Sequence, residues 1–464
     1  MEERIVKSKN LQFVRDGNMF VVWHSLFGYP QILNAEGVDL LEFFSTPKTV
    51  SELRKINEFL DLNENLDLLR RIYFLIPSDL DERSLLHEKT LHCEENIRQG
   101  KEIEYLSLII SEDCNFACKY CISNSMINAS YRRKNRLRLM SLNTAIKAVD
   151  IFVSLLLENG KKEAYINFGG GEPLLNFKVI RKVLEYCKDK YGRILKFKFR
   201  LNSNISLMNR QMAEILKGFG VEIAVSLDGT KGANDAVRQE KSGRGTFERI
   251  MYAIDILRHF GHKVDGFSAT VTEENFNLID DSLIKFAKDY NFSSIRVDLD
   301  VIHLLSIPVE LAIKKIMSLK RLADLNGISL TGFWERPVEN LNLSILEKHI
   351  AFCGGVAGKS MCVSPSEEVF ICGYSANNFA KLSLRSIKKS EKYHSLITKR
   401  LAGRISRCRG CIIEGQCIGG CHITEEFDAL KKEDAIKYNC TLYRSITVEL
   451  LKDNLSEARG REAS

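Results

Sequence analysis

The chain has 464 residues, 27% of them charged and 45% hydrophobic, with a formal net charge of +7 at neutral pH. Its length allows two or three domains around a substantial core, and the small positive charge does not predict nucleic-acid binding. No apolar run is long enough to span a bilayer or to form the core of a signal peptide. We therefore expect a cytoplasmic protein with no nucleic-acid or membrane partner.

Residues 1–90 carry no cysteine and have a pattern of their own. Apolar alternation over residues 11–33, broken by two turns, predicts two or three short strands. Residues 35–60 predict two helices split at Pro47, with Thr49 and Ser51 as candidate caps of the second helix. This order resembles the small winged-helix-like domains that bind the leaders of precursor peptides, in which a sheet edge accepts the leader as an added strand. The resemblance implies leader recognition, and the alternative is a scaffold that only packs on the rest of the chain.

Charge-rich residues follow and predict a linker over residues 91–104, helical or extended. From residue 105 to about residue 300, apolar runs of strand length alternate with amphipathic helical windows, which predicts βα units and a parallel sheet. Ser141 is the candidate cap of the first of these helices. Six units predict an α/β fold of the partial (β/α)6 TIM-barrel type over residues 105–340, with ligands bound at the carboxyl ends of the strands. The expected strands lie at residues 105–110, 163–170, 196–204, 221–229, 264–272 and 294–301, and the helices between them at residues 141–158, 178–190, 209–218, 246–260 and 277–290.

Three cysteines follow the first of these strands with C-x3-C-x2-C spacing, namely Cys114, Cys118 and Cys121. A closed zinc site or 4Fe-4S cluster needs four ligands, so three thiolates predict a site whose fourth ligand comes from outside the chain. A fragment of a zinc site is the alternative. The spacing, with Tyr120 before the third cysteine, resembles the signature of radical S-adenosylmethionine (SAM) enzymes. The resemblance implies a 4Fe-4S cluster that binds SAM and a 5'-deoxyadenosyl radical that abstracts a hydrogen atom from the substrate.

Other segments resemble parts of the same superfamily, and each follows an expected strand. Residues 169–173, "GGGEP", resemble the segment that binds the amino group of SAM, although glycines alone would predict only a tight turn. The third strand ends in "LNSN", where relatives have Thr-Asn-Gly, so only its first asparagine matches. Residues 226–229, "SLDG", and an arginine downstream resemble segments that line the cofactor; a surface ion pair is the alternative for the arginine. The implied cofactor-binding residues are Tyr120, Gly170, Gly171, Glu172, Asn202, Ser226 and Arg238.

Most of the remaining cysteines lie between residues 353 and 440. Eight thiolates are the number that caps two 4Fe-4S clusters, and a two-zinc module is the alternative. Their spacing resembles the SPASM extension of radical SAM enzymes, with Glu367 where that pattern has glycine. The resemblance implies a SPASM domain over residues 341–445. A helical tail is expected over residues 446–464, with a frayed polar end at residues 456–464. The resemblance also implies one auxiliary cluster on Cys408, Cys411, Cys417 and Cys440 and a second on Cys353, Cys372 and Cys421, which Cys362 completes or leaves open to a substrate thiol.

Together the resemblances imply a radical SAM enzyme with three 4Fe-4S clusters that modifies a ribosomally synthesised precursor peptide. A cysteine thioether crosslink is the first expectation. The alternatives are oxidation of a protein Cys or Ser as in anaerobic sulfatase maturases, peptide epimerisation, carbon–carbon crosslinking, and a non-enzymatic zinc-bound adaptor. The N-terminal domain favours a peptide, because a tethered leader makes the second encounter intramolecular. Expected partners are the precursor peptide and an external reductant such as flavodoxin or ferredoxin; no acid or base stands out as catalytic.

Overall fold

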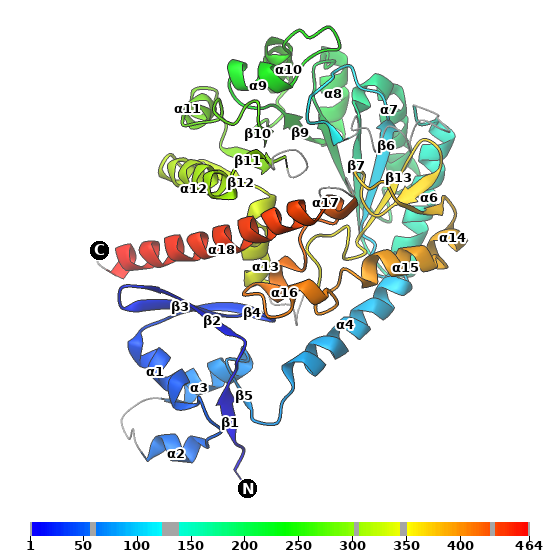
Figure 1. Ribbon diagram of the computed structural model, residues 1–464. Coiled ribbons are helices and arrows are strands. Elements are labelled where there is room, and N and C mark those ends of the chain that lie inside the picture. Colours follow the sequence, from blue (N-terminus) through cyan, green and yellow to red (C-terminus); the bar gives the residue numbers. More distant parts are fainter. Residues whose placement is uncertain are drawn as a thin grey trace.

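The computed structural model describes residues 2–55, 62–122, 139–300, 306–343, 350–426 and 432–462. An N-terminal unit lies at one end of the molecule and a large sheet covered by helices at the other, with the cysteine-rich C-terminal segment between them (Figure 1). None of the helices in these segments combines the length and apolar character that crossing a membrane requires.

The N-terminal unit is built on a three-stranded antiparallel sheet, as predicted. Its strands are β2 (Leu11–Asp16), β3 (Met19–His24) and β4 (Gly28–Leu33). Helices α1 (Ala35–Phe43), α2 (Val50–Arg54) and α3 (Leu62–Arg71) share a hydrophobic core with this sheet, and β1 (Ile5–Lys7) pairs with β5 (Leu75–Pro77). Thr49 caps α2 in a capping box with Glu52, so this predicted cap is confirmed. Helix α3 was not predicted, and the predicted helical residues 56–60 lie outside the described residues.

Helix α4 (Glu82–Arg98) leads from the N-terminal unit to the large sheet, and the predicted boundary at residue 90 falls inside it. Its first residue, Glu82, is buried and binds His24 at 2.5 Å, Ser8 at 2.5 Å and Asn10 at 2.7 Å. Burial alone would raise the pKa of Glu82, but the hydrogen bonds from these three residues outweigh it and lower the pKa. The start of α4 is therefore fastened to the N-terminal unit.

The predicted alternation of strands and helices is confirmed from residue 105 to residue 300. Parallel strands follow one another in chain order: β6 (Tyr105–Ser111), β7 (Glu163–Gly170), β8 (Lys196–Ser203), β9 (Glu222–Ser226), β10 (Gly266–Val271), β11 (Ser294–Leu299) and β12 (Ser329–Thr331). The accompanying helices are α6 (Leu142–Glu158), α7 (Phe177–Tyr186), α8 (Arg210–Gly218), α9 (Lys231–Val237), α10 (Phe247–His259), α11 (Ser282–Asp289) and α12 (Val309–Leu325). Ser141 caps α6 as predicted. The expected six strands are extended by β12, whose three residues are too few to show a period.

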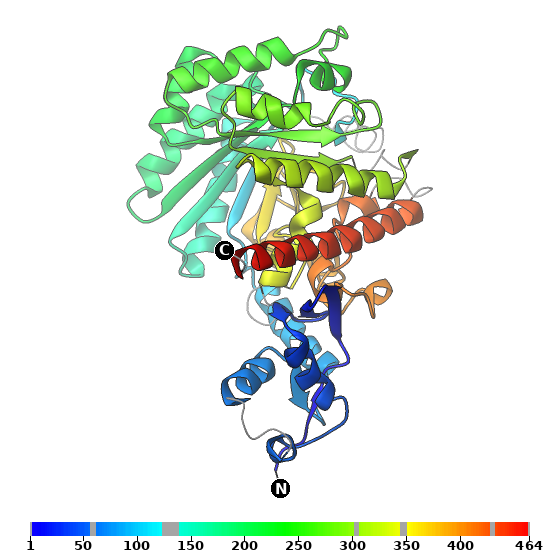
Figure 2. The same ribbon diagram turned by 90° about the vertical axis from the view of Figure 1, so that its left-hand side faces the viewer.

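The two faces of this sheet differ in exposure. Along β8, Phe199 and Leu201 are buried, whereas Lys198 and Arg200, which alternate with them, are exposed. The helices pack on the apolar face, as their place on the outside of the sheet shows (Figure 2). The side chains on the other face of β8 remain exposed.

The C-terminal segment joins the same sheet, which the sequence pattern did not predict. Strand β13 (Ser360–Val363) lies parallel to β6 and continues antiparallel into β14 (Glu368–Phe370) and β15 (Asn378–Lys381), so the sheet is mixed and has ten strands. Glu367, which replaces the glycine of the SPASM pattern, has φ of 58°, a left-handed conformation that glycine adopts more easily. The helices of this part are α13 (Arg336–Asn342), α14 (Leu384–Lys388), α15 (Glu391–Thr398), α16 (Glu414–Cys417), α17 (Ile423–Glu426) and α18 (Lys432–Glu462).

The helical tail expected after residue 445 is the second half of α18. Leu451 and Leu455 are buried in a cluster with Val21 and Trp23 of β3 and Leu341 of α13. Figure 1 shows α18 lying above the N-terminal sheet. These two leucines lie four residues apart on one face of the helix, which explains how this part of α18 packs on β3.

Candidate functional site

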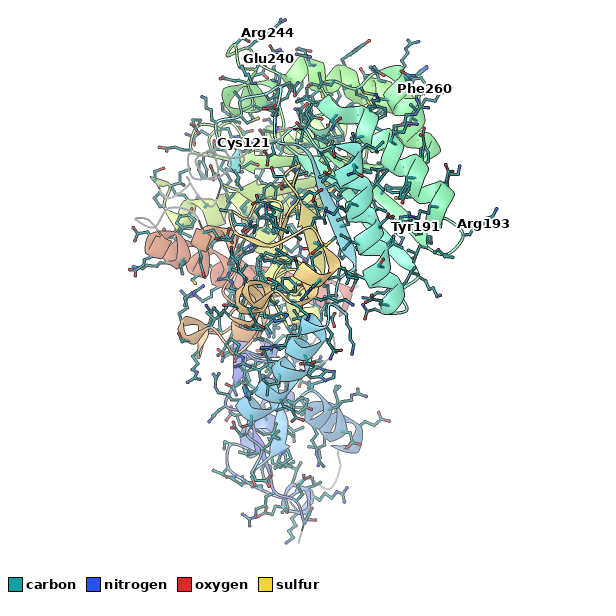
Figure 3. The ribbon with its side chains drawn as sticks, turned by 90° about the vertical axis from the view of Figure 1, so that its right-hand side faces the viewer. Cys121, Tyr191, Arg193, Glu240, Arg244 and Phe260 are labelled. Atoms are coloured by element: carbon teal, nitrogen blue, oxygen red, sulfur yellow. The ribbon has the colours of Figure 1, made fainter. Side chains whose placement is uncertain are left out.

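The first cysteine group lies at the carboxyl ends of the parallel strands. Figure 3 shows Cys121 at the opposite end of the sheet from Tyr191 and Arg193, which precede β8. The loop that carries the three cysteines is held by the segment after α9, because Ala117 N–H donates to the Gln239 carbonyl at 2.7 Å and Lys119 N–H donates to the Val237 carbonyl at 3.0 Å. The loop is therefore fixed on two sides of Cys118.

Polar groups point at the sulfur atoms of this loop. The Cys114 sulfur accepts from Phe116 N–H at 3.4 Å and from the Asn204 amide at 3.8 Å, and the Cys118 sulfur accepts from Arg238 at 3.8 Å. Burial raises the pKa of Cys114 to about 11 and that of Cys118 to about 12, and both thiols interact electrostatically with Cys121. Donors aimed at these sulfur atoms would stabilise thiolates, which is the form in which cysteine binds a metal.

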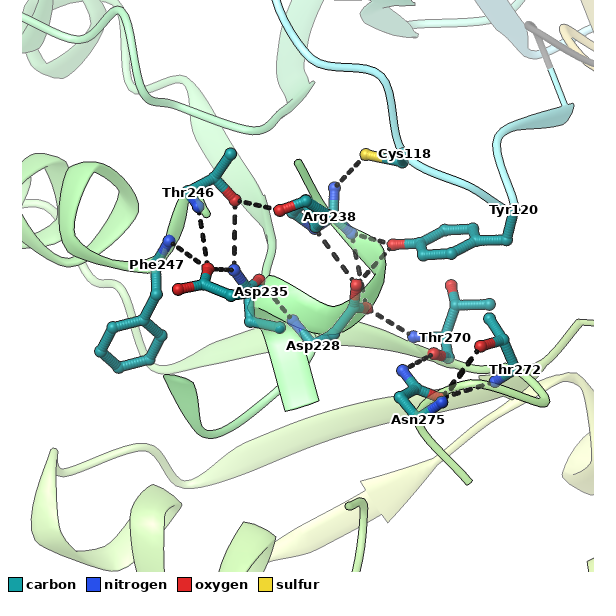
Figure 4. A network of polar contacts seen from close by, with 11 residues as sticks. Cys118, Tyr120, Asp228, Asp235, Arg238, Thr246, Phe247, Thr270, Thr272 and Asn275 are labelled. Carbon is teal, nitrogen blue, oxygen red and sulfur yellow. Dashed lines mark hydrogen bonds and ion pairs between the residues drawn. The ribbon is translucent and has the colours of Figure 1, made fainter. Parts of the chain in front are cut away.

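Arg238 is the centre of a buried network around the cysteine loop (Figure 4). Its guanidinium forms an ion pair with Asp228 at 3.3 Å and donates to the Tyr120 hydroxyl, which itself donates to Asp228 at 2.7 Å. Burial alone would lower the pKa of Arg238, but Asp228 and Tyr120 outweigh it and raise the pKa. Asp228 also accepts from Thr270 N–H at 2.8 Å. The partner of Arg238 is thus a buried carboxylate beside the cysteine loop, not one at the surface.

Tyr120 keeps its proton in this network. Burial, with a contribution from Asp228, raises the pKa of Tyr120 well above its usual value, against the opposing effect of Arg238. The ring also lies 5.6 Å from the Arg238 guanidinium carbon. The hydroxyl of Tyr120 therefore ties the cysteine loop to the ends of β9 and β10.

The glycines after β7 let the backbone pass close to the cysteine loop. A Cβ on Gly170, whose φ is 122°, would lie 2.2 Å from the Ser111 carbonyl oxygen, and one on Gly171 would lie 2.4 Å from the Asp113 carbonyl oxygen. Gly171 N–H donates to Ser111 at 2.8 Å and Glu172 N–H donates to Asp113 at 2.9 Å. Both positions therefore require glycine if the two loops are to meet.

Glu172 is fully buried and joins this loop to the end of β8. Its carboxylate accepts from Leu174 N–H at 2.9 Å, the Ser203 hydroxyl at 2.7 Å and Asn204 N–H at 2.9 Å. Burial raises the pKa of Glu172 to about 7, although these three hydrogen bonds oppose the rise. The carboxylate thus organises the backbone around the site from inside the protein.

Gly171→Ala is expected to lower the free energy of unfolding by about 1–3 kcal/mol, because its Cβ would meet backbone atoms of Asp113 that cannot move independently. Gly218→Ala is the matched control, since a Cβ there meets nothing within 4 Å. Chemical denaturation of the two apo variants and the parent chain measures the difference. Equal stability of the three chains would show that the loops have room to separate.

The remaining motif residues lie at the same end of the sheet. Asn202 is exposed on β8 and Ser226 ends β9. Asn204 was not predicted as a site residue, yet its side chain contacts Cys114 and donates to Asn115 at 3.0 Å. Asn204 departs from the pattern of the relatives, so the resemblance did not mark it. Its position one residue after the end of β8 is the signal that could have indicated a site residue.

The C-terminal cysteines gather in two groups. Burial raises the pKa of Cys408 to about 11, with contributions from Cys440 and Cys411, and raises that of Cys417 well above its usual value, with contributions from Cys408, Cys440 and Cys411. The first group is therefore Cys408, Cys411, Cys417 and Cys440. Cys440 lies on α18 and the others on or beside α16.

The second group forms around Cys372. Burial raises the pKa of Cys372 to about 12, with contributions from Cys353 and Cys362, and raises that of Cys421 beyond the usual range, with contributions from Cys353 and Cys372. Cys362 itself is buried beside Ile109 of β6. Electrostatic contributions therefore connect cysteines within each predicted set, and Cys362 acts on Cys372 of the second. Ligation of clusters by these two sets stays a prediction.

Neither C-terminal group, nor the first loop, has the form of a single-ion site. Within the segments that the structure describes, no three His, Cys, Asp or Glu side chains lie close enough together to share one metal ion. A 4Fe-4S cluster places an iron atom behind each thiolate, so its ligands stand farther apart than those of zinc.

Tyr374 was missed by the sequence analysis and lies between two cysteine groups. Burial raises the pKa of Tyr374 to about 12, with contributions from Cys372 and Cys121, and Arg296 opposes the rise. The side chain is nevertheless 49% exposed, so it borders an accessible space. Asp298 also acts on Tyr374 and binds Arg296 at 2.6 Å. No spacing rule marks a tyrosine two residues after a cysteine.

Comparisons with known proteins identify the domain that carries this site. Residues 108–300 match the Radical SAM superfamily. The chain is 23% identical over 451 residues to the radical SAM cyclopropyl synthase TigE of Paramaledivibacter caminithermalis, which covers 94% of this chain and 93% of that protein. It is 24% identical over 369 residues to a cysteine-type anaerobic sulfatase-maturating enzyme of Clostridium perfringens, which covers 73% of this chain and 94% of that protein.

Solved structures share the fold. The structure of native anSMEcpe with bound AdoMet superposes with a TM-score of 0.59 at 16% identity and covers 76% of this chain and 99% of that one. The structure of Streptococcus suis SuiB bound to precursor peptide SuiA superposes with a TM-score of 0.51 at 14% identity and covers 92% of this chain and 97% of that one.

Proposed function

The chain carries a radical SAM domain over residues 108–300, and we propose that this enzyme modifies a ribosomally synthesised precursor peptide by forming a new bond within it. The observation that carries the proposal is the extent of similarity. TigE matches over 94% of the chain, including the N-terminal unit, whereas the sulfatase-maturating enzyme matches over 73%. A unit of this kind at the N-terminus would hold an additional segment of the substrate, such as a leader.

The first cysteine loop fits the 4Fe-4S cluster and SAM that the radical SAM domain implies. Cys114, Cys118 and Cys121 provide three ligands, and the fourth iron is left for SAM. The close approach of Gly170 and Gly171 to the cysteine loop provides the backbone cradle, and Asn202 and Ser226 line the same end of the sheet. The buried carboxylate of Glu172 supports this cradle by hydrogen bonds to Leu174, Ser203 and Asn204. When bound, the cluster and SAM supply a 5'-deoxyadenosyl radical that abstracts a hydrogen atom from the peptide.

The C-terminal groups fit two auxiliary 4Fe-4S clusters in a SPASM-type domain. Cys408, Cys411, Cys417 and Cys440 would hold one, and Cys353, Cys362, Cys372 and Cys421 would hold the other. If all four cysteines bind the second cluster, each of its irons has a protein ligand. If Cys362 does not bind, one iron is left open to a substrate thiol. Their chemistry is to accept the electron that remains after a hydrogen atom and a proton leave the peptide. An external reductant such as flavodoxin or ferredoxin would supply the electron that starts the reaction.

The space beside Tyr374 is where we place the reacting residue of the peptide. Its phenol lies within electrostatic reach of Cys121 on one side and Cys372 on the other. Its hydroxyl can hold a peptide carbonyl or amide by a hydrogen bond. Asp298 is a carboxylate in the same surroundings and is positioned to receive the proton. The open face of the partial barrel leads to this space.

The N-terminal sheet supplies edges for the leader. Among the described strands, β2 and β4 each pair only with β3, so each leaves one edge open. Pro30 removes one N–H donor from β4. Hydrogen exchange of the full chain with a synthetic leader peptide tests this role: protection of β2 or β4 amides identifies the edge, and no protection of either strand removes leader binding from the proposal.

The product decides between the candidate bonds. Co-expression with the small precursor gene adjacent to its own, followed by mass spectrometry, is expected to show a peptide lighter by two hydrogens. TigE is named a cyclopropyl synthase, which favours ring closure between carbon atoms in this peptide too. Such a product leaves every cysteine of the peptide open to alkylation. The thioether expected from the sequence would instead protect one cysteine of the peptide from alkylation. An unchanged mass would indicate epimerisation, and an oxidised sulfatase side chain would indicate a maturase instead.

A further inference from the structure

We propose that the turn between β3 and β4, Ser25–Phe27, is a structural part of the Cys408 centre, by which we mean Cys408, Cys411, Cys417 and Cys440. The N-terminal unit then has a second task besides leader recognition, because it holds the loops that present these thiols. This inference rests on the proposed function only in taking the four cysteines as ligands of one auxiliary cluster. Trp23, His24 and Arg83 act as positioning residues for that cluster.

Backbone contacts join the turn directly to α16. Gly415 N–H donates to the Ser25 carbonyl at 2.9 Å. In the orientation that satisfies both atoms of its amide, Gln416 donates to the same carbonyl at 3.1 Å and accepts from Gly28 N–H at 3.2 Å. A Cβ on Gly415 would lie 1.9 Å from the Leu26 carbonyl oxygen. The turn therefore packs against the backbone that leads into Cys417.

The turn is itself held in shape by His24, whose ring is fully buried. The Nδ1 atom accepts from Leu26 N–H at 3.1 Å and from Phe27 N–H at 3.2 Å, so the ring proton sits on Nε2, which lies 2.5 Å from Glu82. The ring stacks on Phe27 at 4.4 Å between centroids. The His24 ring thus shapes the turn and connects it to the start of α4.

Two side chains of the N-terminal part bind the other cysteine loops. Arg83 of α4 donates to both oxygens of Glu414, at 2.9 Å and 3.0 Å, and one of these oxygens accepts from Gly410 N–H at 2.8 Å. Gly410 lies between Cys408 and Cys411. The Glu414 side chain is only 2% exposed, so Arg83 neutralises a carboxylate that water hardly reaches.

Trp23 completes the junction. Its indole N–H donates to the Ile412 carbonyl at 2.8 Å, one residue after Cys411. Its ring packs with Leu451 and Leu455 of α18, the helix that carries Cys440. Every segment that bears a thiol of the Cys408 centre therefore contacts the N-terminal part of the chain or lies beside a residue that does. Deleting residues 1–90 would consequently disturb this centre as well as leader binding.

The test compares iron release to a chelator from the anaerobically reconstituted full chain and its variants. In Arg83→Met, about four of about twelve irons are expected to leave at least about tenfold faster than in the parent chain, because the buried Glu414 loses its partner. Trp23→Phe removes one hydrogen bond and keeps a ring, so an increase of about two- to fivefold is expected. The electron paramagnetic resonance signal of the labile cluster should change in parallel, while SAM cleavage persists.

Arg70→Met is the matched control, since Arg70 pairs with Glu3 at the surface of the N-terminal unit. The proposal would be overturned if both variants released iron as slowly as the parent chain. It would also be overturned if all the irons left equally faster, because that result indicates general unfolding. The proposed function is tested separately: the parent chain alone shows whether auxiliary clusters form and whether a peptide is modified. The variants show only whether the N-terminal part holds one of these clusters.

Discussion

Replacement of Cys114, Cys118 and Cys121 by alanine is expected to abolish formation of 5'-deoxyadenosine. The reason is that these three are the cysteines of the loop, so the site loses all three of its proposed protein ligands. The iron content should fall from about twelve to about eight per chain, because the two C-terminal groups keep their thiols. Chromatography of the nucleoside products under strong reductant, together with iron analysis, measures both effects.

Cys93→Ala serves as the control for this triple variant. Cys93 is a half-buried thiol on α4. Burial and Glu102 raise the pKa of Cys93 while Lys89 opposes the rise, and no other cysteine contributes. Its replacement should leave nucleoside formation and iron content unchanged. Cleavage of SAM that survives in the triple variant would mean that the radical does not arise at this loop.

Arg238→Met is expected to lower the free energy of unfolding by about 3–5 kcal/mol, because it leaves Asp228 as an uncompensated buried charge. It also removes the donor to the Cys118 sulfur, so SAM cleavage should slow as well. Tyr120→Phe removes one hydroxyl from the same network and should cost less, about 1–3 kcal/mol. Denaturant unfolding of the apo chains gives the order of the two effects.

Arg193→Met is the control for the loss of an arginine, since Arg193 is exposed in the turn before β8. Surface substitutions of this kind change stability by less than about 0.5 kcal/mol. If Arg238→Met were no less stable than Arg193→Met, the network of Figure 4 would not hold the cysteine loop.

The elements that sequence reasoning recovered are those whose signal is local. The turns that bound β2 and β3, the apolar runs of β6 to β11 and the cap at Thr49 all depend on residues close together in the chain. The same holds for the first cysteine loop, because the spacing of its thiols is set within eight residues. These features need no knowledge of the distant chain.

What sequence reasoning missed depends on contacts between distant segments. The pairing of β13 with β6 joins residues more than 250 positions apart, and no local pattern encodes it. The docking of α18 on β3 was hidden for the same reason. Tyr374 and Asn204 acquire their place only when β8, the cysteine loop and the C-terminal segment are brought together. Long-range packing therefore decided the shape of the site, although local spacing had already indicated its chemistry.

The most direct test is made on the unaltered chain, reconstituted with iron and sulfide under anaerobic conditions and then given SAM and a strong reductant. We predict a brown protein with about twelve irons per chain that releases 5'-deoxyadenosine. A colourless chain without iron, or SAM that remains intact under these conditions, would contradict the assignment of Cys114, Cys118 and Cys121 as the ligands of a radical-generating cluster.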